Sequence, residues 1–158
     1  MLGGGLMVQF FFILILGVLS FIDWKTHRIP DLGNVILYLL GGVPLFFALS
    51  WEKLLGAGIL FSFFFLLYLL RPEGVGFGDV KLSGAIGLFL GWRLGVLALF
   101  LAFLGGALLG VALILKKKKT LKDPLPFAPF LSGGAVVALL WGEKIIAWYL
   151  GLFLLATS

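Results

Sequence analysis

The stretch GVGFGDVK, residues 74–81, lies between two strongly apolar segments and carries three glycines just before Asp79. The apolar run from Leu82 to Gly91 has only 10 residues, about 15 Å at helical rise or half of a bilayer's hydrocarbon thickness. A helix that crosses the bilayer here has to begin near residues 76–78, which places Asp79 at or below the membrane surface. An ionisable group at membrane depth costs roughly 2.5 to 3.5 kcal/mol on insertion scales, so Asp79 is by default a functional-site hypothesis.

The composition predicts an integral membrane protein. The 158 residues are 62 % apolar and 12 % charged, with a mean hydropathy of +1.21, more apolar surface than one soluble core can bury. The apolar runs are long and lack two-residue alternation, so helices rather than barrel strands satisfy the backbone in lipid. We expect an all-α fold, a polytopic membrane bundle of about six transmembrane helices that forms a single domain over residues 1–158. The expected spans are residues 6–22, 32–50, 54–70, 76–91, 94–115 and 130–141, with 145–156 either continuing the sixth span or forming a separate helix.

Several classes of site are excluded or disfavoured. The chain has no Cys, which rules out disulfides, thiolate catalysis and cysteine zinc sites. Its one histidine, His27, has no second His or Cys at ligand spacing, so no metal site is expected. The basic run at Lys116–Lys119 and Lys122 is interpreted as a determinant of topology that faces anionic headgroups. The chain has a net charge of +5. We expect its partner to be the lipid bilayer and do not expect it to bind nucleic acid.

The positions of the basic residues predict the orientation. Nine of the 12 Lys and Arg residues lie in or beside the loops after the first, third and fifth spans, and three lie in the other loops. By the positive-inside rule the nine-residue side is cytoplasmic, the N-terminus is outside and the first run is a retained helix. Asp23, Asp31 and Asp79 then share the cytoplasmic face.

Two of these acids, Asp23 at the end of the first span and Asp79 at the start of the fourth, make a plausible catalytic pair. Two carboxyl groups held close together cannot both ionise, so one keeps a proton while the other acts as a base toward water. This is the chemistry of general acid–base hydrolysis of a peptide bond. The glycines before Asp79 let a substrate approach the backbone closely.

Each charged residue also has a purely structural interpretation. Asp79 could be the N-cap of the fourth helix. Asp23 could be solvated or paired with the basic residues that follow it, and Asp31 could be a helix-start acid after a proline. Lys81 could tune the charge of the site or extend to the headgroups, and its placement on the helix slightly favours the headgroups.

Three segments of the chain together resemble the type IV prepilin peptidases, membrane aspartyl proteases of the GxGD type. Asp23 is followed seven residues later by Pro30-Asp31, residues 76–81 read GFGDVK against the pattern GxGDxK, and residues 126–131 read PFAPFL against a PFGPF-like segment. Each segment alone is weak, but all three in order across six apolar spans are specific. The resemblance implies that Asp23 and Asp79 are the catalytic pair. It also implies substrate-binding or supporting roles for Gly76, Gly78, Lys81, Pro126, Phe127 and Pro129.

The same resemblance implies a function. The family removes the basic leader from type IV prepilins or pseudopilins at the cytoplasmic face of the inner membrane, typically after Gly and before a hydrophobic residue. An acidic pair at that face would attract a basic leader. Proteolysis would need no cofactor, and S-adenosylmethionine would be needed only if the family's N-methylation of the new terminus is retained. Because the chain has no Cys, it resembles a short form that lacks the family's N-terminal zinc-binding domain.

Two other functions are considered. A small ion or proton carrier could relay charge through Asp23 and Asp79, but it would need polar residues deep in the second, third and fifth spans. Those spans hold almost none beyond Asn34, Ser50 and Ser62. A structural assembly subunit would tolerate Asn at both acids.

Overall fold

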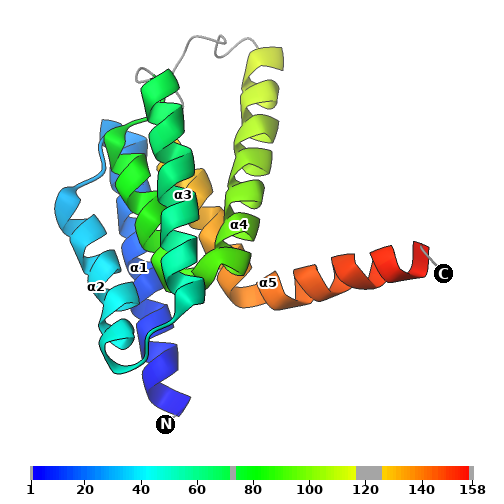
Figure 1. Ribbon diagram of the computed structural model, residues 1–158. Helices are drawn as coiled ribbons and strands as arrows, with labels where there is room; N and C mark the ends of the chain where they lie inside the picture. Colours follow the sequence, from blue (N-terminus) through cyan, green and yellow to red (C-terminus); the bar gives the residue numbers. More distant parts are fainter. Residues whose placement is uncertain (1, 72–73, 117–125, 157–158) are drawn as a thin grey trace.

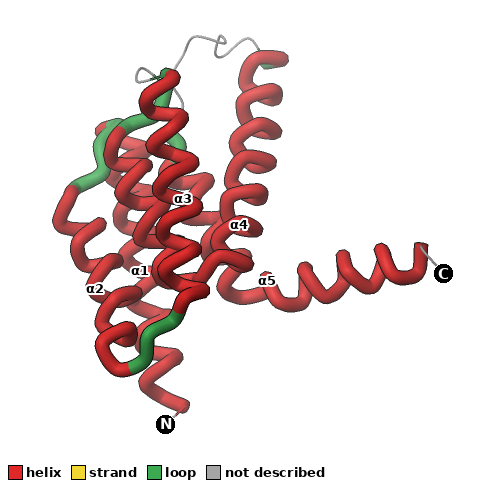
Figure 2. The backbone as a smooth tube through the Cα atoms, in the orientation of Figure 1, coloured by secondary structure: helices red, strands yellow, loops and turns green. Residues whose placement is uncertain are grey.

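The computed structural model describes residues 2–71, 74–116 and 126–156, and this part of the chain is all helical. Five helices follow one another: α1 (Leu2–Thr26), α2 (Asp31–Phe47), α3 (Trp51–Leu70), α4 (Phe77–Leu115) and α5 (Ala128–Ala156). The tube in Figure 2 shows that short loops join the first four helices. The predicted all-α fold is confirmed.

α4 is divided at Gly91, which has φ 79° and ψ 172°. This backbone conformation is essentially restricted to glycine, so the helix is interrupted there. Figure 1 shows the first half of α4 descending beside α3 and the second half ascending again. Counting the two halves separately gives six helical segments, in agreement with the expected number. The turn that the sequence suggested at residues 92–93 is thus one residue earlier.

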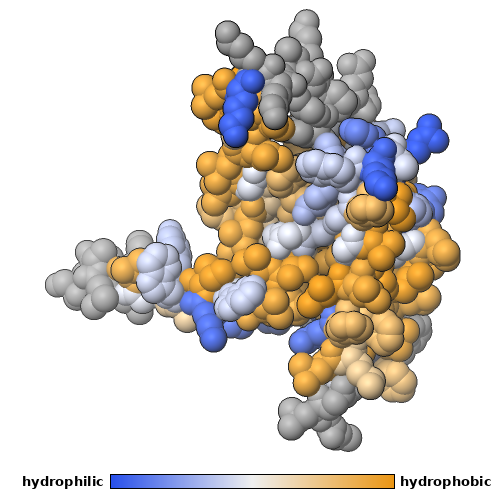
Figure 3. Space-filling view, turned by 180° about the vertical axis from the view of Figure 1, so that it is seen from behind, coloured by the Kyte–Doolittle hydropathy of each residue, from blue (hydrophilic) through white to orange (hydrophobic). Residues whose placement is uncertain are grey.

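In the part of the chain that the structure describes, four helices are long and apolar enough to cross a membrane: α1, α3, α4 and α5. α2 is shorter and equally apolar over Asp31–Leu45. Hydrophobic residues cover most of the face in Figure 3, while hydrophilic residues gather mainly toward its upper end. This distribution fits a bundle whose sides face lipid and whose ends face water.

α5 resolves the question that the sequence left open about residues 142–156. The helix continues through residues 142–144 without a break, so the sixth expected span and residues 145–156 belong to one helix. Figure 1 shows that its C-terminal part extends away from the bundle, and Trp148 and Tyr149 are exposed on it.

Glycine brings the helices close together at two crossings. Gly56 of α3 faces Gly87 of α4 so closely that a Cβ on either would overlap the other's backbone. A Cβ on Gly134 of α5 would likewise overlap the carbonyl oxygen of Ala98 in α4. Small residues permit such backbone approach, which stabilises helix packing where lipid offers no hydrophobic drive. The buried core around these crossings comes from every helix and includes Phe12, Leu16, Leu37, Leu60, Phe64, Leu82, Ile86 and Leu131.

This packing brings the sites of interest to one end of the bundle. α1 and α3 end, and α2 and α4 begin, at the upper end in Figure 1. Asp23, Asp31 and Asp79 therefore share one end, as the count of alternating spans predicted.

Candidate functional site

Asp79 lies in the first turn of α4, and only 8 % of the residue is exposed. The N-cap position belongs to Gly76 rather than to Asp79. The Asp79 carboxylate is nevertheless engaged there, since its Oδ2 accepts a hydrogen bond of 3.2 Å from the Gly76 N–H. Its other oxygen, Oδ1, is buried and has no hydrogen-bond partner among the described residues. Asp79 thus contributes to the helix start through one oxygen and keeps the second available.

Asp23 lies in the last turns of α1 and is also buried, with 5 % exposed. Its Oδ2 accepts a hydrogen bond of 3.2 Å from the Ala128 N–H. Within the described ranges it forms no ion pair with Lys25 or Arg28. The interpretation of Asp23 as a solvated or ion-paired acid is therefore wrong.

The two acids are neighbours although they are 56 residues apart in sequence. Asp23 lies close enough for its charge to act on Asp79. The loop after α1 supports this approach, because a Cβ at Gly78 would lie only 3.0 Å from the Ile29 Cβ. Glycine at position 78 thus leaves room for the α1–α2 loop to contact the first turn of α4. The structure brings together the two acids that the sequence singled out.

The segment around residues 126–130 approaches Asp23 through its backbone. α5 begins at Ala128, and the first N–H groups of a helix have no partner within the helix, so they are free to bind a carboxylate. Phe127 anchors the segment in the core, with its ring centroid 5.6 Å from Phe64 and 5.0 Å from Phe103. Pro126 is buried beside it and Pro129 half-buried in the first turn of α5.

The Ala128 N–H was not anticipated from the sequence. In the sequence, position 128 differs from the family's segment only in having alanine where glycine is commoner. Its contact with Asp23 uses the main chain. The available signal was its position: the start of a helix after a proline leaves free N–H groups.

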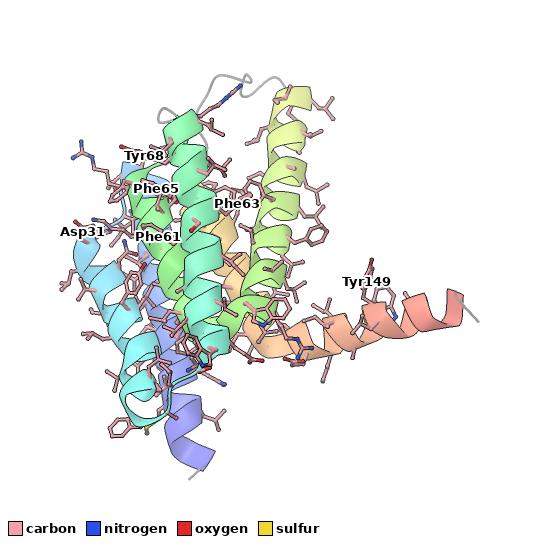
Figure 4. The ribbon with its side chains drawn as sticks, in the orientation of Figure 1. Asp31, Phe61, Phe63, Phe65, Tyr68 and Tyr149 are labelled. Carbon is pink, nitrogen blue, oxygen red and sulfur yellow. The ribbon has the colours of Figure 1, made fainter. Side chains whose placement is uncertain are left out.

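Lys81 and Asp31 form an ion pair, with 2.7 Å between Lys81 Nζ and Asp31 Oδ1. The Lys81 ammonium group also lies 5.2 Å from the centre of the Phe77 ring. Lys81 is thus paired with the first residue of α2, and its extension toward the headgroups stays a prediction. Asp31, labelled in Figure 4, begins α2 as expected, and it also links this helix to α4.

Aromatic residues of α3 cover the neighbouring faces of α4. Figure 4 shows Phe61, Phe65 and Tyr68 along one side of α3, with Phe63 on another. The Tyr68 ring lies 5.5 Å from that of Phe77, which directly precedes the GDVK turn. Within the described ranges no group of three or more His, Cys, Asp or Glu residues is placed to hold a metal ion.

The helices and their apolar sides define a multi-pass membrane protein with two buried acids at one end. Residues 10–111 match the model of the type IV leader peptidase family. The chain belongs to this family, as its three motifs suggested. Both Asp23 and Asp79 fall within the matched residues.

Comparison with curated proteins supports the same family. The chain is 37 % identical to a prepilin leader peptidase/N-methyltransferase of Aeromonas salmonicida over 161 residues, 96 % of this chain and 55 % of the relative. Proteins of the same name from Bacillus subtilis and Legionella pneumophila are 40 % and 33 % identical, over 64 % and 93 % of this chain and 41 % and 55 % of the relatives. This chain thus spans about half the length of the curated relatives it matches. The search of solved structures found no match.

Proposed function

We propose that this protein is an aspartyl endopeptidase of the inner membrane that removes the basic leader from type IV prepilins or pseudopilins. The observation that carries the proposal is the approach of Asp23 and Asp79 at one end of the bundle, in a chain of the leader peptidase family. Residues 1–158 act as one domain, with the N-terminus outside and the acids at the cytoplasmic face, because basic residues are concentrated on that side.

The chemistry follows from two close carboxyl groups that share one proton. The ionised carboxylate takes a proton from water, whose oxygen attacks the scissile carbonyl carbon. The protonated carboxyl group donates to the carbonyl oxygen, and the departing amine takes a proton as the C–N bond breaks. The Gly76 and Ala128 N–H groups each hold one oxygen of an acid in place, and Asp79 Oδ1 is free of protein partners among the described residues. Each carboxyl group is thereby oriented by one hydrogen bond and can still accept others.

The substrate follows from the surroundings of the pair. An acidic site attracts a basic leader, and the apolar sides of the bundle suit the hydrophobic segment after the cleavage point. Cleavage after Gly and before a hydrophobic residue is expected from the family. Gly76, Gly78 and Phe127 support the site through backbone approach and core packing.

Two cavities among the described residues are a poor match for S-adenosylmethionine. The relatives are named N-methyltransferases, and S-adenosylmethionine would need polar partners for its ribose hydroxyls and amino-acid portion. A cavity of about 370 Å³ is lined mainly by apolar residues, with Gln9 and Lys53 as its polar members. A second, of about 400 Å³, is lined by Val137, Trp141, Lys144, Ile145 and Trp148. Neither presents a carboxylate, so neither fits the cofactor.

The alternative of an ion or proton carrier is weaker. In the described part the buried polar residues are Asp23, Asn34, Asp79, Ser83 and Ser132. Each lies within about two turns of a helix end on the side of the acids, so they do not form a path across the bundle.

The test is cleavage of a co-expressed prepilin with a basic leader and a Gly-Phe junction in membranes. We expect Asp23→Asn and Asp79→Asn each to lower cleavage by at least about 10³-fold, since removing one member of a catalytic unit costs nearly the whole effect. Glu143→Gln, an acid on α5 away from the pair, is the matched control and should cleave like the wild type. Normal cleavage by either Asn variant would overturn the proposal.

A further inference from the structure

The two segments that carry the acids are linked by contacts that catalysis itself does not require. Ile29, in the loop after Asp23, packs on Gly78, directly before Asp79. Further along the chain, two residues after Ile29 and three after Gly78, Asp31 and Lys81 form their ion pair. The loop between α1 and α2 is thus attached to the first turns of α4 at two adjacent points.

This link joins two helices, α1 and α4, that do not pack mainly against each other. α1 packs mainly against α5, whereas α2 and α3 pack against α4, so the helices that carry the acids do not share their main interface. The Asp31–Lys81 pair supplies an attraction of opposite charges between the two segments that carry the acids.

The contact partners of Lys81 indicate its role. Its side chain is 34 % exposed and that of Asp31 72 % exposed. The Lys81 ammonium group pairs with the Asp31 carboxylate and lies 5.2 Å from the centre of the Phe77 ring, which are both parts of the protein. These contacts are with groups other than the two acids.

We infer that Lys81 is a positioning residue whose ion pair with Asp31 sets how closely Asp23 approaches Asp79. The inference rests on the proposed function for its effect on catalysis, and on geometry alone for its effect on the distance between the acids. Catalysis by two groups is sensitive to such a distance, since a displacement of about 1 Å can cost about 10²-fold in rate.

The activity test compares Lys81→Met, Asp31→Asn, the double variant of both, and the exchange Lys81→Asp with Asp31→Lys. Each single neutral variant should lower kcat about tenfold with KM changed less than about twofold, because geometry rather than substrate binding is disturbed. The neutral double variant should be no worse than either single variant, as expected for partners in one interaction. The exchange should recover at least about half of the wild-type kcat, because the attraction is restored with reversed polarity.

The matched control is the other ion pair of the described part, Arg93–Glu143, at 3.8 Å and distant from the acids. Arg93→Met should leave kcat unchanged. A rise in KM at constant kcat for Lys81→Met, with no recovery in the exchange variant, would show that Lys81 binds substrate and would overturn the inference.

A second readout needs no activity. The chain has no Cys, so Asp23→Cys/Asp79→Cys can be crosslinked by a short thiol reagent with no competing thiol. Adding Lys81→Met should reduce the crosslinked fraction several-fold, and adding Arg93→Met should not. An unchanged fraction would refute the positioning role even if no substrate were cleaved, whereas failure of the wild type to cleave would refute only the proposed function.

Discussion

The two halves of α4 differ in how far they are buried. From Val80 to Leu88 every residue but Lys81 is buried, between α2, α3 and the rest of the bundle. In the second half only Gly95, Ala98 and Ala102 are buried, and Phe100, Leu108 and Leu115 are largely exposed.

The buried half is the less apolar of the two and carries small and polar residues. The first half carries Asp79, Ser83, Gly84 and Gly87 on its way to Gly91. Ser83 Oγ donates hydrogen bonds to the carbonyl oxygens of Val80, at 2.8 Å, and Leu60 of α3, at 3.2 Å. Because lipid tails are as apolar as leucine, close backbone approach and interhelical hydrogen bonds decide which face is buried. The close approach at Gly87 and the hydrogen bond from Ser83 to α3 thus accompany the burial of the first half, which also carries Asp79.

The largest difference in stability between the two halves is expected from a substitution at Gly87. Gly87→Leu would force a side chain into the backbone of Gly56, and overpacking of this kind costs about 1–3 kcal/mol or more. We expect the thermal midpoint in detergent to fall sharply and α3 to separate from α4.

The control in the second half is Gly105→Leu. The nearest atom to a Cβ at Gly105 is the Phe130 Cδ1, at 3.6 Å, an ordinary contact. The thermal midpoint of Gly105→Leu should fall much less than that of Gly87→Leu. Equal losses for the two variants would show that both halves are packed alike.

The point where the halves meet is tested by Gly91→Ala. At φ 79° and ψ 172° an alanine is strained, at a cost of about 1–3 kcal/mol. The reversal of α4 should weaken, measured as a lower midpoint in detergent. Gly58→Ala, where a Cβ meets nothing within 4 Å, should be neutral or slightly stabilising, since alanine is the better helix former. A neutral Gly91→Ala would mean that the break does not depend on glycine.

Much of the fold could be predicted from the sequence. Long apolar runs ended by charged turns gave the number and order of the segments, and alternation of spans placed Asp23, Asp31 and Asp79 at one end. The reversal at Gly91 was misplaced by one residue because Trp92 and Arg93 are the polar signal, while the backbone that turns is a glycine with no side chain to mark it.

The acids of the candidate site could be selected from the sequence, but the groups that hydrogen-bond to them could not. Hydropathy and family motifs select Asp23 and Asp79, but the donors that hold them are the main-chain N–H groups of Ala128 and Gly76, which have no side-chain signature. The Asp31–Lys81 pair joins residues 50 positions apart, so only the packing of α2 on α4 reveals it. Local pattern identifies the charges, whereas tertiary packing decides which of them meet.

The claim on which everything else depends is that Asp23 and Asp79 form one site. Crosslinking of Asp23→Cys/Asp79→Cys in native membranes measures it directly, with Asp23→Cys/Glu143→Cys as the control pair. We predict an intramolecular crosslink by a short thiol reagent in the first pair and none in the second. Absence of a crosslink in the first pair, in protein that is inserted and folded, would contradict the account.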